Sequence, residues 1–509
     1  MSRPDTLPEL TRAQKVSTMA GTLLGLLLAA LDQTIVATAA PVIQRDLRIE
    51  PALYAWITTS YLVASTVLLP IWGKLSDLYG RKRILVAGMS IFLAGSALCG
   101  IAGTTLQLIL FRAVQGIGSA ALFTTAFAVI ADIFPPAERG KYQGIYGSVF
   151  ALSSVIGPLL GGVITDQVGW HWVFLVNLPL GAIALGFVGA KMPPLRRVSL
   201  TKTRIDVAGS AALVVALVPL LVAISLGHGE SVDPAHAAGY AWGSAPILGL
   251  FALAALGFAA FLVIERRAPD PLLDLRLFKN RTFAIGNVTA FVMGMSFLGA
   301  ITFLPLFMVE VVHLSATKSG LTTVPLTMGI VGGNIVIGQV VSRLGRYRPL
   351  MRLAAAMMIV SFGVMGFTLS ADSTRLEVSL KMIFIGLSIG PMIPLFTLAV
   401  QSAVDPRQIG VATSTVTFFR SMGVTIGLAI LGTVFASVLG SHIGHEPREA
   451  AFTLAIEMIY RICMGIAVIG LVLTIVMPEK ALRPAGSVSV RPAGTSGQYP
   501  SRAVGHVGE

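Results

Sequence analysis

Long apolar segments without charge recur along the whole 509-residue chain, and they constrain its fold more than any other feature. A window of about 19 residues finds fourteen of them, centred near residues 29, 64, 93, 118, 153, 181, 216, 254, 296, 331, 360, 389, 424 and 466. Lipid offers no partner for an unpaired backbone group, which favours helices, and no segment alternates like a barrel strand. The sequence therefore predicts an all-α integral membrane protein with fourteen transmembrane helices.

Composition and charge agree with a chain whose main solvent is lipid. Charged residues make up 12% of the sequence, whereas soluble domains carry about 25%. If the loops alternate between the two sides of the membrane, most Lys and Arg residues fall on the side of the termini, in loops such as 191–204 and 265–281. The positive-inside rule then predicts a cell-membrane protein with both termini in the cytoplasm. This bias explains the net charge of +13 without a nucleic-acid partner.

Motifs for metals, nucleotides and enzymatic catalysis are missing from the sequence. The two cysteines, Cys99 and Cys463, lie in separate apolar segments, so neither a disulfide nor a metal site is expected. Neither His171 nor His313 has metal-ligand spacing, and no P-loop indicates nucleotide binding. We expect no cofactor and no enzymatic activity.

One motif occurs twice and indicates that the chain has two similar halves. The stretch GKLSDLYGRKR (73–83) follows the second apolar segment, and GQVVSRLGRYR (338–348) follows the tenth. Both read Gly, six residues, Gly-Arg-x-Arg, with Ser342 in the place of Asp77. Such repeats place a transport pathway between the halves, near the middle of the membrane. The predicted organisation is a tail (1–16), a six-helix bundle (17–206), two bridging helices with a loop (207–281), a second six-helix bundle (282–477) and a disordered tail (478–509).

Five motifs resemble those of a known transporter family, the major facilitator superfamily. GKLSDLYGRKR resembles its loop signature, RAVQGIGSA (112–120) its fourth-helix motif, and GSVFALSSVIGPLLGG (147–162) the fifth-helix motif of its drug/proton antiporters. LDQTIVATAAP (31–41) and WHWVFLVNLPLG (170–181) resemble motifs of the fourteen-helix drug:proton antiporter branch, although His171 stands where that branch usually has Arg. The resemblance covers roughly residues 17–480.

The resemblance implies proton-driven export of small lipophilic or cationic compounds, such as drugs, by alternating access. Protons and membrane lipids are then the other expected partners. Two alternatives remain open at this point. One is a lipid or glycolipid exporter on the same scaffold, and the other, from a different class, is a membrane sensor that transports nothing.

Asp32 is the strongest candidate for proton coupling. It lies in the middle of the first apolar segment, where a carboxylate costs about 2.5–3.5 kcal/mol even on the mildest insertion scale. Arg112 and Arg420 lie within the fourth and thirteenth segments, and Arg420 shares the mid-depth of Asp32. We therefore expect Asp32 and Arg420 to pair across the cavity, with Arg112 assisting proton movement. A fixed structural ion pair is the alternative for Asp32, and snorkelling to the membrane surface is the alternative for Arg112.

Two further acids are weaker candidates for proton handling. Asp166 ends the fifth segment on the predicted outer side, where it could equally cap the turn before Trp170. Glu310 stands where the resembled branch more often has Gln, near the predicted outer surface.

Two motifs predict conformational gating. In the repeated loop, an acid and two glycines are suited to a polar latch on the cytoplasmic side, although a simple positive-inside loop is the alternative. In the fifth helix, small residues at four-residue spacing and a proline predict a close-packed seam between the bundles, with ordinary helix packing as the alternative. The predicted gating residues are Gly73, Asp77, Gly80, Arg81, Arg83, Gly157, Pro158, Gly161 and Gly162.

The substrate pocket is predicted from aromatic and Met residues, which suit varied apolar ligands but also fill ordinary cores. The residues chosen for this role are Phe418, Phe419, Phe303 and Met293.

Overall fold

A computed structural model describes residues 10–49, 53, 56–194, 206–228, 240–312, 324–370, 373–405, 408–442 and 445–478. Its helices follow the fourteen predicted segments in order. In the first half they are α1 (Arg12–Asp46), α3 (Trp56–Tyr79), α4 (Arg81–Cys99), α5 (Thr105–Ile133), α6 (Pro136–Val168), α7 (His171–Leu175) and α8 (Asn177–Lys191). In the second half they are α11 (Arg281–Glu310), α13 (Val324–Leu344), α14 (Arg348–Thr368), α15 (Arg375–Ile389), α16 (Met392–Ser402), α17 (Ile409–His442) and α18 (Arg448–Val476).

Two helices, α9 (Val207–Leu226) and α10 (Ala245–Arg267), connect the halves. They pack against each other, and α9 also contacts α3 of the first half and α17 of the second. Short elements complete the described chain: the strands β1 (Gly227–His228) and β2 (Tyr240–Ala241), which pair in parallel, and the 3-10 helix η1 (Leu275–Lys279).

The fold class predicted from the sequence is confirmed. Thirteen helical stretches in the described residues are long and apolar enough to cross a membrane, and α11, at the ninth predicted place, is a further helix of 30 residues. The sixth and twelfth segments each consist of two consecutive helices. Between α15 and α16 lies Pro391, which has no amide hydrogen to continue the helical ladder.

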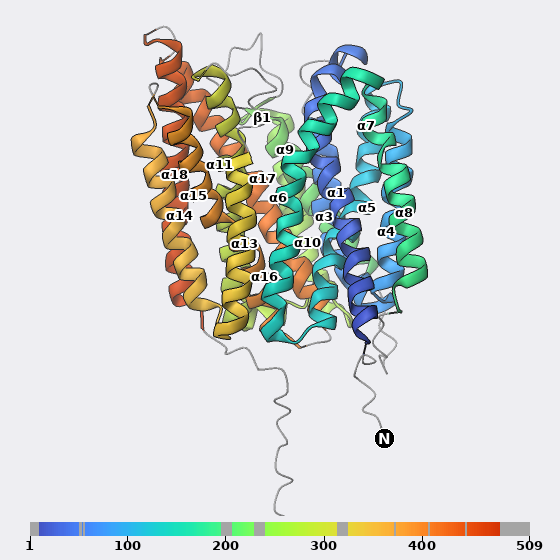
Figure 1. The fold of residues 1–509 in the computed structure, drawn as a ribbon. Helices are drawn as coiled ribbons and strands as arrows, with labels where there is room; N and C mark the ends of the chain where they lie inside the picture. The colour runs from blue at the N-terminus through green and yellow to red at the C-terminus, as the bar shows by residue number, and fades with distance from the viewer. Residues whose placement is uncertain are drawn as a thin grey trace, which may run out of the picture.

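The two groups of helices stand side by side, and the start of α1 and the end of α18 lie at the same end of the molecule (Figure 1). We call this end the terminal face and the opposite end the distal face. Helix α1 begins at Arg12, earlier than the expected residue 17, because Thr11 and Gln14 form a capping box. The predicted C-terminal tail lies outside the described residues beyond Pro478.

Each group of helices has its own apolar core. Leu26, Tyr61, Phe92 and Leu122 are among the core residues of the first group. The core of the second group includes Met351, Phe362, Met382, Ile456 and Tyr460. Large apolar side chains such as Leu106, Ile183, Leu256 and Met328 are exposed on the outside, as a surface that contacts lipid requires.

The repeated motif takes the same form in both halves. Gly80 and Gly345, which are equivalent in the two copies, both have positive φ angles, 92° and 64°, that favour glycine. Gly73 lies against Ser414 of α17, and its counterpart Gly338 lies against Gly140 of α6. The glycine of each copy therefore brings a helix of one half close to a helix of the other.

Candidate functional site

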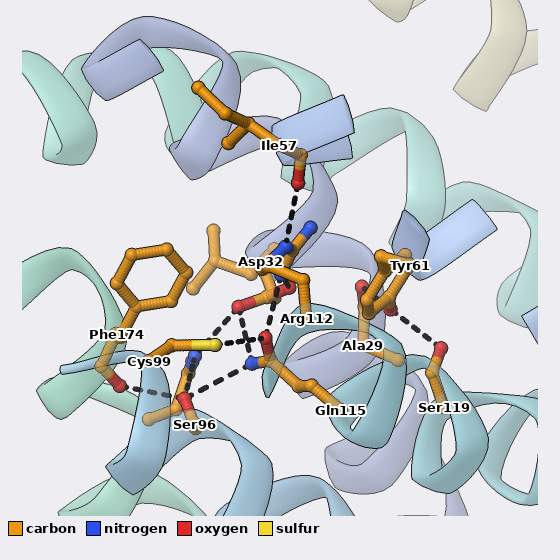
Figure 2. Close-up of polar contacts among 12 residues, drawn as sticks. Ala29, Asp32, Ile57, Tyr61, Ser96, Cys99, Arg112, Gln115, Ser119 and Phe174 are labelled. Atoms are coloured by element: carbon orange, nitrogen blue, oxygen red, sulfur yellow. Dashed lines mark hydrogen bonds and ion pairs between the residues drawn. The ribbon is translucent and has the colours of Figure 1, made fainter. Parts of the chain in front are cut away.

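Asp32 of α1 lies at the centre of a fully buried polar cluster inside the first group of helices. Its Oδ2 accepts a hydrogen bond from Nη1 of Arg112 at 2.6 Å, and both side chains are 0% exposed. Its Oδ1 accepts from Nε2 of Gln115 at 2.8 Å and from Nδ2 of Asn177 at 3.0 Å (Figure 2). Four helices, α1, α4, α5 and α8, contribute to the cluster, since Ser96 of α4 accepts from both amides.

Arg112 is held by more than its ion pair with Asp32. Its Nε donates to the carbonyl of Ile57 at 3.1 Å, and its Nη1 also donates to Oε1 of Gln115 at 2.6 Å. The guanidinium lies 4.3 Å from the ring centre of Tyr61 and 5.7 Å from that of Phe174, in cation–π contact with both. Arg112 therefore does not snorkel to the surface.

The hydrogen bonds of the cluster match an ionised Asp32. All three neighbouring side-chain groups donate to the carboxylate, and the hydroxyl of Ser96 donates away from it to the carbonyl of Phe174 at 2.8 Å. A proton on Asp32 would turn an acceptor into a donor and remove the counter-ion of Arg112. An unpaired buried charge costs about 3–5 kcal/mol. Protonation is therefore incompatible with this closed packing, and the cluster must rearrange or admit water.

A cavity lies between the two groups of helices, next to this cluster. It has a volume of about 150 Å³. Gln33 and Leu62 line it and directly follow the cluster residues Asp32 and Tyr61 in the sequence. The described residues that line it are Leu26, Gln33, Leu62, Ser65, Thr66, Leu69, Phe123, Phe127, Tyr146 and Gly147 from the first half, and Phe297, Ile393, Thr417, Arg420, Ser421, Val424 and Thr425 from the second.

Arg420 faces this cavity and does not pair with Asp32, so the predicted pairing across the cavity is wrong. Asp32 is bonded to Arg112 within one group of helices. Within the described part of the chain, Arg420 has no ion-pair or hydrogen-bond partner, and it is half-buried in the cavity wall. Of the lining residues that the structure describes, it alone carries a charge.

At the terminal face, Asp77 forms a polar link between the two groups of helices. Its Oδ1 pairs with Nη2 of Arg81 at 2.7 Å, and Nε of Arg81 pairs with Oδ2 of Asp132 at 2.6 Å. Its Oδ2 accepts from the backbone amide of Val411 at 3.1 Å. Val411 is in the first turn of α17, where amides have no partner within the helix and the helix dipole favours an anion. Asp77 thus caps a helix of the other half, not the helix that follows it.

Close packing completes the closure of the terminal face. A side chain at Gly410 would meet the carboxylate of Asp77, and one at Gly73 would meet Ser414. Farther along, Nε2 of Gln143 donates to Oε1 of Gln401 across the halves at 2.8 Å. The structure is therefore closed at the terminal face.

The fifth-helix motif lies in two different environments. Gly147 faces Asn334 of α13, so this part forms the predicted contact between the halves. A side chain at Gly157 or Gly161 would instead meet α1, at Thr34 or Thr38 of the same half. Pro158 lies within α6 between them, and a side chain added at Gly162 would meet no atom within 4 Å. The prediction that this entire stretch packs between the halves is therefore wrong for Gly157 and Gly161.

The remaining predicted residues are placed as follows. Asp166 and Arg83 are exposed, at the distal end of α6 and the terminal end of α4. The backbone of Glu310 ends α11, and its side chain lies outside the described parts. None of the four predicted pocket residues lines the cavity. Met293 faces Gly470, and the ring of Phe303 lies near the ring of Phe435. Phe419 lies near Phe278, and Phe418 packs against the apolar cluster around α9.

Sequence reasoning missed Gln115, Asn177 and Ser96 as members of the cluster. The first two lie within motifs quoted above, RAVQGIGSA and WHWVFLVNLPLG, so the signal was present. An amide in an apolar segment, placed within such a motif, is a candidate to orient a buried carboxylate.

Comparison with known proteins identifies relatives over most of the chain. A family model described as the Major Facilitator Superfamily matches residues 22–428. The chain is 42% identical over 431 residues to "Multidrug resistance protein 3" of Bacillus subtilis (strain 168), covering 84% of this chain and 81% of the relative. It is 39% identical over 431 residues to "Multidrug transporter protein MdtP" of the same organism, covering 84% and 77%. The solved proton:xylose symporter XylE has a similar fold, with a TM-score of 0.64 at 14% identity over 93% of this chain and 98% of that one.

Proposed function

The chain belongs to the major facilitator superfamily, and we propose that it is a proton-coupled exporter of small lipophilic compounds that works by alternating access. The names of the two Bacillus relatives support small-molecule drugs as substrates. We further propose that it lies in the cell membrane with the terminal face in the cytoplasm, as the distribution of basic residues predicts.

The observation that carries the proposal is the sealed acid–base pair beside the cavity. Asp32 and Arg112 are both 0% exposed, and three side-chain donors surround the carboxylate of Asp32. A proton can reach Asp32 only if the surrounding helices move, and a protonated Asp32 leaves Arg112 without its counter-ion. Protonation and helix packing are therefore linked in free energy, which is what coupling of a proton gradient to a conformational change requires.

The closed terminal face supports alternation. The Asp77–Val411 link and the glycine contacts hold the terminal face closed in this conformation. In the proposed cycle this link breaks when the cavity opens to the cytoplasm and forms again when it opens to the outside. Asp32 exchanges its proton as the packing of α1, α4, α5 and α8 changes.

The proposal is tested in proteoliposomes that contain a pH-sensitive dye and an imposed proton gradient. Two lipophilic probes of opposite charge, ethidium and naphthalene-2-sulfonate, are added to the wild type, to Asp32→Asn and to Glu138→Gln. The last variant neutralises an exposed acid at the start of α6 and serves as a matched control. We expect a probe-dependent proton flux in the wild type and in Glu138→Gln, and none in Asp32→Asn.

Other outcomes would contradict parts of the proposal. Flux that persists in Asp32→Asn would place the coupling acid elsewhere, with Asp166 and Glu310 as the remaining candidates. Absence of flux with both probes in the wild type, together with accelerated movement of a labelled lipid, would favour the lipid exporter.

A further inference from the structure

Among the described residues that line the central cavity there is one cation and no anion, and this asymmetry bears on the substrate. We propose that the cavity recognises compounds that combine an apolar body with an anionic group, and that Arg420 is the counter-ion of that group. The inference rests on the proposed export function and specifies its substrate class. It replaces the lipophilic cations expected from the sequence.

Packing of α17 against α11 directs Arg420 into the cavity. A side chain at Gly294 of α11 would meet the backbone carbonyl of Arg420, and side chains at Gly423 and Gly427 would meet the backbone of α11 at Phe291 and Met295. The two helix backbones are therefore in close contact along this stretch. Thr417, Arg420, Ser421, Val424 and Thr425 lie on the cavity side of the same helix.

Arg420 is the one charged donor among the described residues that line the cavity, beside the neutral amide of Gln33 and the hydroxyls of Thr66 and Ser421. The hydroxyls of Ser65, Thr417 and Thr425 donate to carbonyls of their own helices, at 3.1, 2.8 and 3.0 Å, so that they offer mainly lone pairs to a ligand. A guanidinium offers five N–H donors in a planar fork that matches carboxylate, sulfonate or phosphate oxygens. A ligand group that satisfies Arg420 must therefore accept hydrogen bonds, and an anion does so best.

The same charge disfavours cationic ligands. Nothing that lines the cavity within the described residues is an Asp or a Glu, and the nearby Asp32 is already neutralised by Arg112. A positively charged compound would meet the guanidinium in a water-poor space, where like charges repel strongly.

The rest of the wall indicates the apolar body of the ligand. Phe123, Phe127 and Phe297 lie in the wall together with Leu26, Leu62 and Leu69. A volume of about 150 Å³ accommodates an aromatic ring system of one or two rings in this conformation. A naphthalene ring with one charged group is thus a suitable probe.

The test uses three naphthalene compounds whose charge does not depend on pH: naphthalene-2-sulfonate, the neutral naphthalene-2-sulfonamide, and 2-naphthyltrimethylammonium. Binding to the purified full-length protein is measured in detergent, which requires no proton gradient. The variants are Arg420→Gln, Arg420→Lys and the control Arg266→Gln, which removes an exposed charge at the end of α10. Thermal unfolding and size-exclusion profiles establish that each variant is folded.

We expect the wild type to bind the sulfonate at least tenfold more tightly than the trimethylammonium compound. Arg420→Gln should lower the affinity for the sulfonate at least tenfold and change the affinity for the sulfonamide little. Arg420→Lys should retain part of the sulfonate affinity, and Arg266→Gln should bind all three compounds as the wild type does. Equal or tighter binding of the trimethylammonium compound, or unchanged sulfonate affinity in folded Arg420→Gln, would overturn the inference. If Arg420→Gln does not fold, the wild-type charge series and Arg420→Lys decide alone.

The binding test separates this inference from the proposed function. Tight and Arg420-dependent sulfonate binding without proton flux in liposomes would uphold the anion site and refute proton coupling. Proton flux driven by ethidium but not by the sulfonate would uphold coupled export and refute the anion site.

Discussion

The link between Asp77 and the first turn of α17 gives a quantitative prediction for the substitution Asp77→Ala. In the closed terminal face, the Asp77 carboxylate accepts from the amide of Val411 at 3.1 Å. A hydrogen bond to a charged group contributes about 1.5–3 kcal/mol, and an anion at a helix N-terminus about 0.3–1 kcal/mol. The Asp77–Arg81 pair lies at one end of one half and is not counted, because opening need not break it.

The closed state should therefore lose about 2–4 kcal/mol relative to the open state, a change of about 30-fold or more in their ratio. A thiol introduced by Ser414→Cys reports this ratio, because position 414 is buried against Gly73 at the terminal face. When opening is fast relative to alkylation, the rate at which a polar maleimide modifies this thiol is proportional to the open population.

We expect Asp77→Ala to increase the alkylation rate by at least tenfold over the parent protein. Ser342→Ala is the matched control: Ser342 occupies the equivalent position in the second copy of the motif, and its hydroxyl donates to Gln339 of its own helix at 2.8 Å. A rate within twofold of the parent in Asp77→Ala, or an equal increase in Ser342→Ala, would refute the latch.

Three other predictions follow from the same geometry. Asp32→Asn and Arg112→Gln should each lower the free energy of unfolding in detergent by about 3–5 kcal/mol. The double variant should lose clearly less than the sum of the two, and additive losses would contradict a dominant ion pair. Gly410→Ala should speed alkylation of the reporter thiol without changing any charge, because the new methyl group meets the carboxylate of Asp77; an unchanged rate would contradict this packing. If one proton enters for each anion exported, both steps carry positive charge inward. An inside-negative potential should therefore speed naphthalene-2-sulfonate export in liposomes, and export that does not depend on the potential would exclude this exchange.

The positions of the helices could be predicted because lipid imposes one strong rule on the sequence. Each predicted segment centre falls within a helix, including those near residues 216 and 254 that connect the two halves. The repeat centred on Gly73 and Gly338 likewise predicted two related halves, because a glycine at a close helix crossing is a local requirement. These features depend on hydropathy and backbone conformation, which can be read from the local sequence.

Depth in the membrane alone could not predict which charged side chains pair with each other. Arg112 and Arg420 are both arginines in apolar segments, and the sequence gives their height but not the direction in which each side chain points. The structure places Arg112 on the side of α5 that faces Asp32, and Arg420 on the cavity side of α17. Opposite charges at matching depth are thus insufficient grounds for pairing.

The residues predicted to line the pocket lie outside the cavity for a similar reason. Phe418 and Phe419 were selected as neighbours of Arg420 in the sequence, but consecutive helix residues point about 100° apart. The residues that share the cavity with Arg420 on α17 are Thr417, Ser421, Val424 and Thr425, of which Thr417 and Val424 lie three and four residues from Arg420. Polar residues spaced by three or four from a buried charge would have indicated the cavity better than adjacent aromatic rings.

The measurement that tests the central claim most directly is the change in bound protons when substrate binds. Purified protein in a weakly buffered detergent solution is mixed with saturating naphthalene-2-sulfonate or ethidium, and the change in pH is recorded for the wild type, Asp32→Asn and Glu138→Gln. If Asp32 couples proton and substrate, the compound that binds should change the number of bound protons, by uptake or release, in the wild type and in Glu138→Gln, and leave it unchanged in Asp32→Asn. A pH change in Asp32→Asn equal to that of the wild type would contradict the account.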